Sequence, residues 1–338
     1  MRKMATIRKI DEINPIDGAD AIEVATVGGW KVVVKKGEFT AGDLAVYCEI
    51  DSWIPSTIAP FLTKPGHFPK VYEGVEGERL RTVKMRGQLS QGLLLNLDNV
   101  IPETNSFAEG DDVSEHLNIQ KWEMTVPAQL AGQVKGNFPS VIPKTDQERV
   151  QNLKKEIEGL GNMDFEVTEK LEGSSMTCYL IDGEFGVCSR NMDLKRDENN
   201  SFWAVAIEQD IEERMRLVGD NFAIQGELIG PGIQGNIYKL SKPEFYVFDM
   251  YDIHAGMYLK PRDRRAIIAQ MRLNHVPYLS DAVNVVGYDT TVQGLLDLAE
   301  GKSTLNPKQE REGIVFKAES GGMTFKAISN RYLIKQKD

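Results

Sequence analysis

Residues 165–190 have the sequence FEVTEKLEGSSMTCYLIDGEFGVCSR, and this stretch decides the fold of the larger part of the chain. Phe165 and Val167 alternate with polar residues, so residues 165–169 are expected to form a strand with one apolar face. Asp182-Gly183 separates the apolar runs 174–181 and 184–189, and this dipeptide is a strong hairpin signal. The stretch therefore predicts three strands, of which the last two form an antiparallel hairpin.

The sequence around this stretch mixes helical and strand patterns in irregular order. Helices are expected at 201–217, 262–273 and 291–300, and strands at 222–228, 245–253, 313–317 and 323–328. This order is typical of an α+β fold with antiparallel sheets. Upstream, Thr145 and Glu148 have the spacing of a capping box, which predicts a helix that begins at Thr145 and has Arg149 in its first turns.

The N-terminal part of the chain has short alternating runs broken by glycine, proline and aspartate. These runs predict strands at 5–10, 21–27, 30–34 and 44–50, and such spacing favours a small barrel or sandwich. Residues 122–144 have weak periodicity and several prolines and glycines, as interdomain connections do. We therefore expect one domain at 1–121, a linker at 122–144 and a second domain at 145–338.

The composition excludes several classes of protein. A chain of 338 residues with 41% hydrophobic content is expected to form two domains with cores of their own. Three cysteines without a C-x-x-C pair argue against a disulfide framework and a thiolate zinc site. The sequence has no signal-peptide pattern and no apolar run long enough to cross a bilayer, so we expect a soluble intracellular protein, in the cytoplasm or nucleus, without membrane contact.

The net charge of −10 provides no strong general attraction for nucleic acid. A polyanionic partner therefore requires a local basic surface. The N-terminal domain has one candidate, which consists of Arg79, Arg81, Lys84 and Arg86.

Two common kinds of active site are improbable. Gly301-Lys302-Ser303 resembles the end of a phosphate-binding loop, but the glycine required five residues earlier is Leu296. The four histidines are scattered along the chain, which argues against a histidine metal site or a histidine-dependent active site.

Lysine and carboxylate chemistry remains. Lys170 lies one residue beyond an alternating run and three residues before Gly173, where a ligand could approach closely, so it is a candidate nucleophile. The same K-x-x-G spacing occurs at Lys84–Gly87. The spacing alone leaves two candidates, and each could be an ordinary solvated lysine before a turn.

The order of the motifs distinguishes the two lysines. Downstream of Lys170 come CSRN at 188–191, QGELIG at 225–230, an aromatic strand at 245–253, EGIVFK at 312–317 and FK at 325–326. In this order they resemble the covalent nucleotidyltransferase superfamily, which comprises nucleic-acid ligases and messenger-RNA capping enzymes. Together with RTVKMRGQLSQGLLL at 81–95, the whole chain resembles RNA ligases that have an N-terminal OB-fold. The resemblance implies an OB-like β-barrel domain followed by an adenylyltransferase domain.

The resemblance also implies roles for individual residues. Lys170 would attack the α-phosphorus of ATP, and Lys326 would contact the α-phosphate. Glu312 would be the third catalytic residue. Mg²⁺ or Mn²⁺ would be held through water by Glu312, Glu172 and Glu227. Contacts with ATP would come from Glu169, Arg149 (pyrophosphate), Arg190 (ribose or phosphate), Glu227 (ribose), Phe248 (adenine) and Lys317.

Elementary chemistry adds a requirement to these roles. A lysine with a pKa of about 10.4 is protonated at neutral pH, so Lys170 must be discharged by desolvation or by nearby positive charge before it can act as a nucleophile. Lys326 and a metal ion could supply that charge.

The sequence departs from the superfamily pattern at two places. Glu172 stands where the superfamily commonly has aspartate, one methylene shorter. Lys326 is followed by Ala327-Ile328 instead of a second lysine, so the shared task falls to Lys326 alone or to Lys317. For Arg149 the alternative to a phosphate contact is an exposed helix arginine paired with Asp146 or Glu156.

Three functions are consistent with these patterns. Only 12 residues, 327–338, follow Lys326, which leaves no room for the C-terminal OB-fold of capping enzymes and DNA ligases. We therefore expect a monomeric, ATP-dependent RNA ligase that forms lysyl-AMP, transfers AMP to a 5′-phosphate and seals it to an RNA 3′-hydroxyl at nicks in duplexes. The alternatives are a nucleic-acid-binding protein with an inactive nucleotidyltransferase domain, and a GTP-dependent capping enzyme with rearranged domains.

Overall fold

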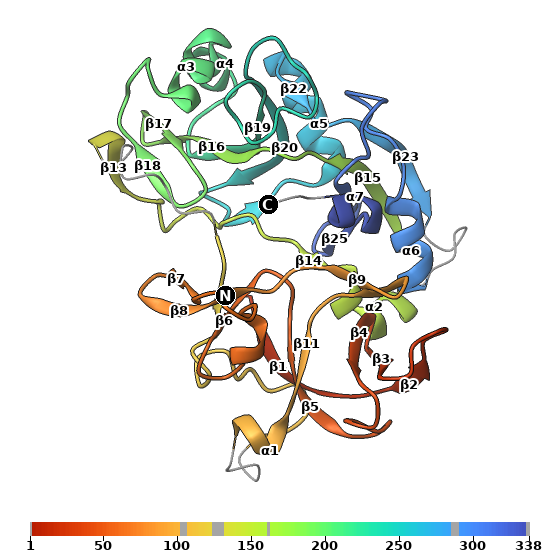
Figure 1. Ribbon diagram of the computed structural model, residues 1–338. Coiled ribbons are helices and arrows are strands. Elements are labelled where there is room, and N and C mark those ends of the chain that lie inside the picture. The colour runs from red at the N-terminus through yellow and green to blue at the C-terminus, as the bar shows by residue number, and fades with distance from the viewer. Residues whose placement is uncertain (1, 102–106, 124–131, 161–162, 285–290, 336–338) are drawn as a thin grey trace. The chain divides into compact units, whose positions relative to one another are not determined.

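A computed structural model describes residues 2–101, 107–123, 132–160, 163–284 and 291–335 (Figure 1). The chain divides into two compact units, residues 1–125 and 126–338. The expected linker at 122–144 includes β13 (Val134–Asn137), a strand of the second unit, and part of it lies outside the described residues. Among the described residues, no helix has the length and apolar character needed to cross a lipid bilayer.

The first unit is built almost entirely from antiparallel strands. β1 (Ala5–Lys9), β5 (Leu44–Cys48) and β11 (Leu93–Asn96) form one sheet, and β2 (Glu12–Pro15), β3 (Ile22–Val27) and β4 (Trp30–Lys35) form another. A third sheet has the order β12 (Gln120–Lys121), β6 (Ser52–Pro55), β8 (Val75–Arg79), β7 (Lys70–Tyr72). A hairpin of β9 (Val83–Met85) and β10 (Gln88–Ser90), the 3₁₀ helix η1 (Pro60–Leu62) and helix α1 (Leu97–Val100) complete it.

The core of this unit explains why the apolar runs predicted its strands. Ile7 of β1 and Val46 and Cys48 of β5 are fully buried in one core cluster. The predicted strands at 5–10, 21–27, 30–34 and 44–50 are confirmed within two residues. β2 was not predicted, because its side chains are mostly exposed and carry no apolar alternation.

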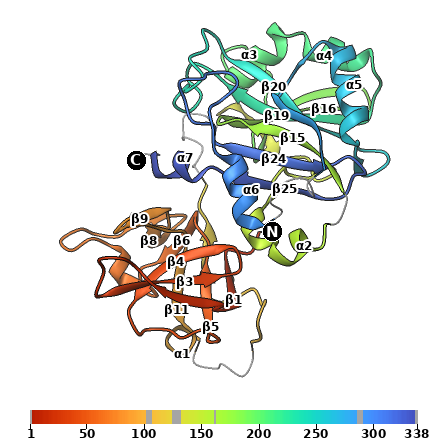
Figure 2. The same ribbon diagram turned by 90° about the vertical axis from the view of Figure 1, so that its right-hand side faces the viewer.

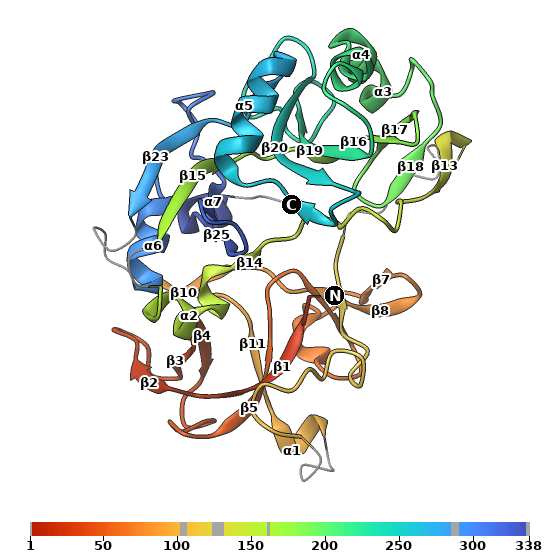
Figure 3. The same ribbon diagram turned by 180° about the vertical axis from the view of Figure 1, so that it is seen from behind.

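The second unit contains two sheets. The larger has the order β13, β18 (Met192–Leu194), β17 (Glu184–Cys188), β16 (Ser174–Ile181), β19 (Phe222–Ile229), β20 (Glu244–Asp252), β21 (Met257–Tyr258), and β22 (Asn274–His275) also pairs with β20. The smaller has the order β14 (Glu148–Arg149), β25 (Thr324–Ile328), β24 (Gly313–Ala318), β15 (Asp164–Lys170), β23 (Tyr278–Asn284), and Figure 3 shows β15 beside β23. Among the described strands of these two sheets, all pairings are antiparallel except β14 with β25 and β20 with β22.

Helices cover the outer faces of these two sheets. α3 (Ser201–Glu208), α4 (Ile211–Arg216) and α5 (Pro261–Met271) pack on the larger sheet through one apolar core (Figure 2). α6 (Val292–Ala299), joined by residues of the short helices η4 (Val150–Asn152) and α2 (Lys154–Glu158), packs on the smaller sheet. The last helix, α7 (Asn330–Lys335), follows β25. The α+β fold with antiparallel sheets is therefore confirmed.

Two predicted helices differ from the structure. No helix begins at Thr145, because Glu148 and Arg149 pair with β25 and the Glu148 carboxylate accepts hydrogen bonds from Arg149 N and Asn152 Nδ2, both at 2.9 Å. The predicted helix at 201–217 is two helices, α3 and α4. Asp210 separates them with a left-handed backbone, φ 50°. No glycine or proline in the local sequence signals the missing helix at Thr145 or the break at Asp210.

Candidate active site

The smaller sheet brings a lysine and a carboxylate together at the ends of two neighbouring strands, β15 and β24. Lys170 is the last residue of β15, and its backbone is paired with Gly313, the first residue of β24. Glu312 immediately precedes that strand. The Lys170 Nζ atom lies 2.7 Å from Glu312 Oε1, and both side chains are partly exposed. Two motifs that are 142 positions apart in the sequence thus meet in one ion pair.

The loop after Lys170 lies tightly against the larger sheet. At Gly173, an added Cβ would lie 2.4 Å from Leu228 O and 2.9 Å from Glu227 Cγ, so only glycine allows this approach. The Glu172 N–H donates a hydrogen bond of 2.5 Å to the Tyr238 hydroxyl. The loop therefore places Glu172 and Glu227 at the same site as Lys170 and Glu312.

The charges of these groups influence one another. Burial alone would lower the pKa of Lys170, but the Glu312 and Glu227 carboxylates outweigh it, and the pKa is raised. Burial raises the pKa of Glu227 to about 7, and the Lys170 ammonium partly opposes this shift. Burial also raises the pKa of Glu172, and the Glu312 carboxylate adds to the effect. The site thus holds a charged lysine among three carboxyl groups.

A second group of charges lies on β25 and the loops near it. The Asp146 carboxylate contacts Lys326 Nζ at 3.0 Å and Arg190 Nη2 at 3.8 Å. Arg149 on β14 is paired in register with Lys326 on β25, and it is buried. Arg190 also acts electrostatically on Lys170, which links the two groups. Lys326 and Arg190 are therefore two cations beside Lys170, and Arg149 is the strand neighbour of Lys326.

Phe248 and Lys317 contact each other beside the residue that follows Lys170. Lys317 Nζ donates to the Phe248 carbonyl oxygen at 2.6 Å, contacts Asp249 Oδ2 at 2.6 Å and lies 5.4 Å from the Phe248 ring centroid. Phe248 is half-buried and packs with Leu171, the residue after Lys170. Burial lowers the pKa of Lys317 to about 8. Lys317 thus supports Phe248 from within the protein.

A buried ion network continues from Asp249. Arg264 on α5 contacts Asp249 and Glu166, and the side chains of Arg264 and Glu166 are fully buried. Arg264→Met is expected to destabilise the second unit by about 3 kcal/mol, because it removes a buried guanidinium and leaves the buried Glu166 and Asp249 carboxylates with one charged partner fewer each. Urea unfolding measures this loss. The control Arg265→Met, which removes a partly exposed partner of Glu166, is expected to cost less than half as much. Equal losses would contradict the role given to Arg264.

Glu169 has an unsatisfied oxygen beside this region. Its side chain is 1% exposed, and Oε2 accepts a hydrogen bond of 2.7 Å from the Thr304 N–H. Oε1 is buried and has no hydrogen-bond partner among the residues that the structure describes. Thr304 precedes Leu305, which packs in the same cluster as Phe248. A buried acceptor without a donor is costly, and it suits a ligand that brings an N–H group.

The carboxylates of the site fit a divalent cation. Glu312, Glu227 and Glu172 are hard oxygen donors of the kind that Mg²⁺ and Mn²⁺ prefer. Within the described part of the chain, no group of three or more His, Cys, Asp or Glu side chains is arranged to hold a metal ion directly. The donor set therefore fits a cation that keeps part of its water shell.

The four predicted basic residues of the first unit differ in their surroundings. Arg79 Nη2 contacts Asp51 Oδ1 at 2.6 Å, and its guanidinium lies 3.9 Å from the Trp122 ring centroid. Arg81 and Lys84 are exposed. Arg86 and Gly87, with φ 48° and 85°, form the two-residue turn between β9 and β10. Lys84 and Arg86 thus project from a hairpin, whereas Arg79 is engaged within its own unit.

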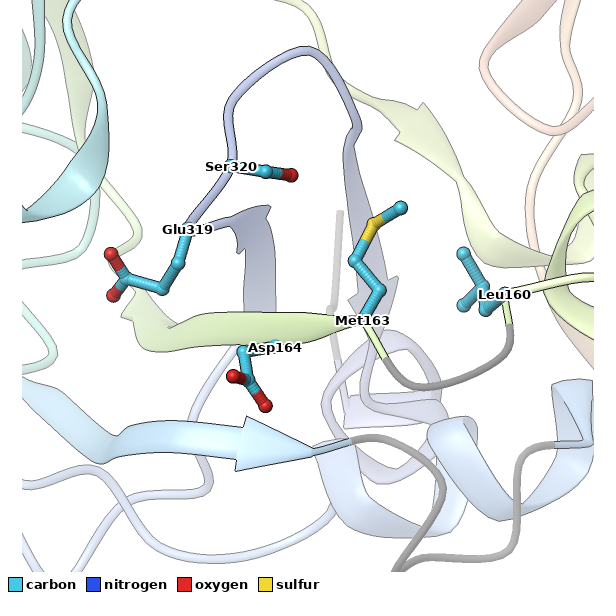
Figure 4. Close-up of a pocket in the computed structure, with 5 residues that line it drawn as sticks. All are labelled: Leu160, Met163, Asp164, Glu319 and Ser320. Atoms are coloured by element: carbon cyan, nitrogen blue, oxygen red, sulfur yellow. The ribbon is translucent and has the colours of Figure 1, made fainter.

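The surface hollow in Figure 4 lies elsewhere. Leu160, Met163, Asp164, Glu319 and Ser320 line it. Asp164 begins β15 and Lys170 ends it, so the hollow and the lysine are roughly 20 Å apart at about 3.3 Å per residue. The hollow is therefore not part of the candidate active site.

Three residues of the site were not found from the sequence. The sequence suggests Asp146 only as an alternative partner of Arg149. The structure places its carboxylate between Lys326 and Arg190. Tyr238 and Tyr332 both bind Glu172, one through the backbone and one through the carboxyl group. Only the T-D-x-x-R pattern at 145–149 could have drawn attention to Asp146, and the tyrosines have no motif of their own.

Comparison with protein families defines the class of this chain. A family model described as an OB-fold domain matches residues 4–97, and a model described as RNA ligase matches residues 163–335. The chain belongs to the RNA ligase family, with an N-terminal OB-fold domain ahead of the ligase domain. A comparison with curated protein sequences finds no match.

Solved structures of the RNA ligase of Naegleria gruberi are similar over nearly the whole chain. The structure with pyrophosphate is 46% identical, covers 98% of each chain and has a TM-score of 0.90. The E227A variant with ATP and Mn is 47% identical with complete coverage of both chains and a TM-score of 0.91. In a further variant of that enzyme, 47% identical with a TM-score of 0.91, covering 98% of this chain and 97% of that one, an aspartate numbered 172 is changed to alanine. This chain has Glu172 at that number.

Proposed function

We propose that this member of the RNA ligase family is an ATP-dependent ligase that works through a lysyl-AMP intermediate on Lys170. The observation that carries the proposal is the convergence of Lys170, Glu312, Glu227 and Arg190 at the end of β15. The structures of the Naegleria relative with ATP, AMP, Mn and pyrophosphate support the same substrate and metal for this chain.

The first step requires a change at Lys170. In the structure its ammonium is paired with Glu312 and its pKa is raised, so it is not a nucleophile. ATP binding has to break this pair, and the ammonium then loses a proton to solvent. The free amine attacks the α-phosphorus, an N–P bond forms, the P–O bond to pyrophosphate breaks, and the nitrogen releases a second proton to solvent.

The cations beside Lys170 receive the phosphates. Asp146 contacts both Lys326 and Arg190, and a phosphate that replaces this carboxylate would meet two positioned cations. Arg149 lies beside Lys326 and is suited to the departing pyrophosphate. Mg²⁺ or Mn²⁺, held through water by Glu312, Glu172 and Glu227, would supply positive charge that favours the neutral amine and the α-phosphate.

One feature favours ATP over GTP. Glu169 Oε1, which has no hydrogen-bond partner among the described residues, can accept a hydrogen bond from the amino group of adenine, whereas guanine presents an oxygen at the equivalent place. Phe248 offers a half-buried ring, held by Lys317, on which either purine can stack. The Glu169 acceptor therefore counts against the guanylyltransferase alternative.

The later steps join two nucleic-acid ends. AMP passes from Lys170 to a 5′-phosphate, and an RNA 3′-hydroxyl then attacks that phosphate and releases AMP. We propose nicks in RNA-containing duplexes as the substrate, with residues 145–338 as the adenylyltransferase domain and residues 1–121 as the nucleic-acid-binding domain. A sealing assay on nicked duplexes with an RNA or a DNA 3′-hydroxyl end tests this. Sealing only with the RNA end is expected, whereas no sealing of either end would favour a binding protein without ligase activity.

The hairpin of β9 and β10 is proposed to contact the nucleic-acid backbone. Reversing the charge of both Lys84 and Arg86 to glutamate is expected to weaken nick binding about tenfold and to reduce its salt slope by about 2, because two phosphate contacts are lost. Titrations at several salt concentrations measure both effects. Lys35→Glu with Lys36→Glu, on exposed residues at the end of β4, is the matched control for net charge. Equal weakening in the control would sink this assignment.

A further inference from the structure

The side chain of Glu172 is longer than that of the aspartate usual at this position. The superfamily commonly has aspartate at this point, and the Naegleria relative has an aspartate at the same number. Glutamate is one methylene longer and has one more freely rotating bond, so its carboxylate is harder to hold in one place. A chain with glutamate here benefits from a second contact that fixes the carboxylate.

Tyr332 provides that contact. Its hydroxyl is hydrogen-bonded to the Glu172 carboxyl group, and its side chain is largely buried on α7. The Glu172 backbone is fixed separately, by the 2.5 Å hydrogen bond from its N–H to the Tyr238 hydroxyl. Glu172 is thus held at both ends, by two tyrosines from different elements.

The position of Tyr332 is itself well defined. Glu300 accepts hydrogen bonds of 2.8 Å from the Ser329 hydroxyl and from the Asn330 N–H at the start of α7. The Tyr332 N–H donates to the Ser329 hydroxyl oxygen at 3.1 Å. The Ser329 N–H also donates to the Glu312 carbonyl oxygen at 2.9 Å. The start of α7 is therefore tied to Glu312 by the backbone and to Glu172 by Tyr332.

We propose that Tyr332 is a positioning residue that holds the Glu172 carboxylate at the Lys170 site and thereby raises the affinity of the site for its divalent cation. The inference rests on the proposed function, because it assumes that Glu172 faces a cation there. Partners that orient the groups around a metal, as Tyr332 would orient Glu172, commonly change metal affinity by a factor of 10 to 100.

The test compares Tyr332→Phe, Glu172→Asp and the double variant. Binding of Mn²⁺ alone to the nucleotide-free enzyme is measured by calorimetry. Tyr332→Phe is expected to weaken Mn²⁺ binding about tenfold. In the Glu172→Asp background the same change is expected to alter binding less than twofold, because the shorter carboxylate no longer reaches the hydroxyl. Thermal unfolding of each variant checks that α7 remains folded.

A matched control removes a tyrosine hydroxyl elsewhere. Tyr179→Phe deletes a hydroxyl that donates to Asp193 at 2.9 Å in another buried pair, and it is expected to leave Mn²⁺ binding unchanged. Equal weakening by Tyr332→Phe in both backgrounds, no weakening in either, or no Mn²⁺ binding by the wild type would overturn the proposal. Covalent labelling of the wild type by ATP is followed separately. A wild type that binds Mn²⁺ but is not labelled would refute lysyl-AMP formation while the Tyr332 comparison remained valid.

Discussion

Lys170→Ala is expected to reduce covalent labelling by ATP at least about a thousandfold, to below detection, because the variant lacks the amine that would form the N–P bond. Non-covalent ATP binding is expected to persist, since Lys326, Arg190 and Phe248 are untouched. The variant should also be no less stable, because the change removes only one partly exposed ion pair. Labelling with α-labelled ATP, followed by denaturing electrophoresis, measures the first effect.

The second K-x-x-G sequence of the chain supplies the control. Lys84 is exposed on β9, and Lys84→Ala is expected to label as well as the wild type. Labelling of the Lys170 variant at more than a few per cent of the wild-type level would mean that another residue accepts AMP. Loss of labelling in the Lys84 variant would point to the first unit instead.

Lys326→Met is expected to slow adenylation by about 100- to 1000-fold. The loss has two causes: one positioned cation is removed from the α-phosphate, and the Asp146 carboxylate loses its closest partner near that phosphate. Single-turnover adenylation at saturating ATP measures the rate.

The role of Asp146 provides a sharper form of this prediction. If its charge opposes the phosphate once Lys326 is gone, Asp146→Asn in the Lys326→Met background should recover about tenfold of the lost rate. A double variant that is slower than Lys326→Met alone would indicate that Asp146 positions another group. Lys335→Met, which removes an exposed lysine of α7, is expected to leave the rate unchanged.

The sequence predicted the elements that have local signals. The hairpin at Asp182-Gly183 connects β16 and β17, and α6 begins after Thr291, whose side chain accepts the capping hydrogen bond from Gly294 N. The expected helix at Thr145 was wrong, since the parallel pairing of Glu148 and Arg149 with a strand about 180 residues away determines the local structure. Local propensity contains no information about such a pairing.

The same distinction applies to the site. The order of the motifs predicted that Glu312, Glu227 and Glu172 lie near Lys170, and the structure brings these four residues together, whereas their roles stay predictions. The sequence could not predict three ion pairs. The Lys170 ammonium is paired with Glu312, the Asp146 carboxylate is paired with Lys326, and the Arg79 guanidinium is paired with Asp51. Each of these depends on contacts between side chains distant in sequence, which only the folded structure defines.

The most direct test of the account is to find the residue that carries AMP. The wild-type protein is incubated with ATP and Mg²⁺ after removal of any bound nucleotide, and the adduct is located by tandem mass spectrometry of its peptides. We predict one adenylyl group on Lys170 and none when GTP replaces ATP. An adduct on Lys326, Lys84 or any other residue, a guanylyl adduct, or an unmodified protein would contradict the central claim.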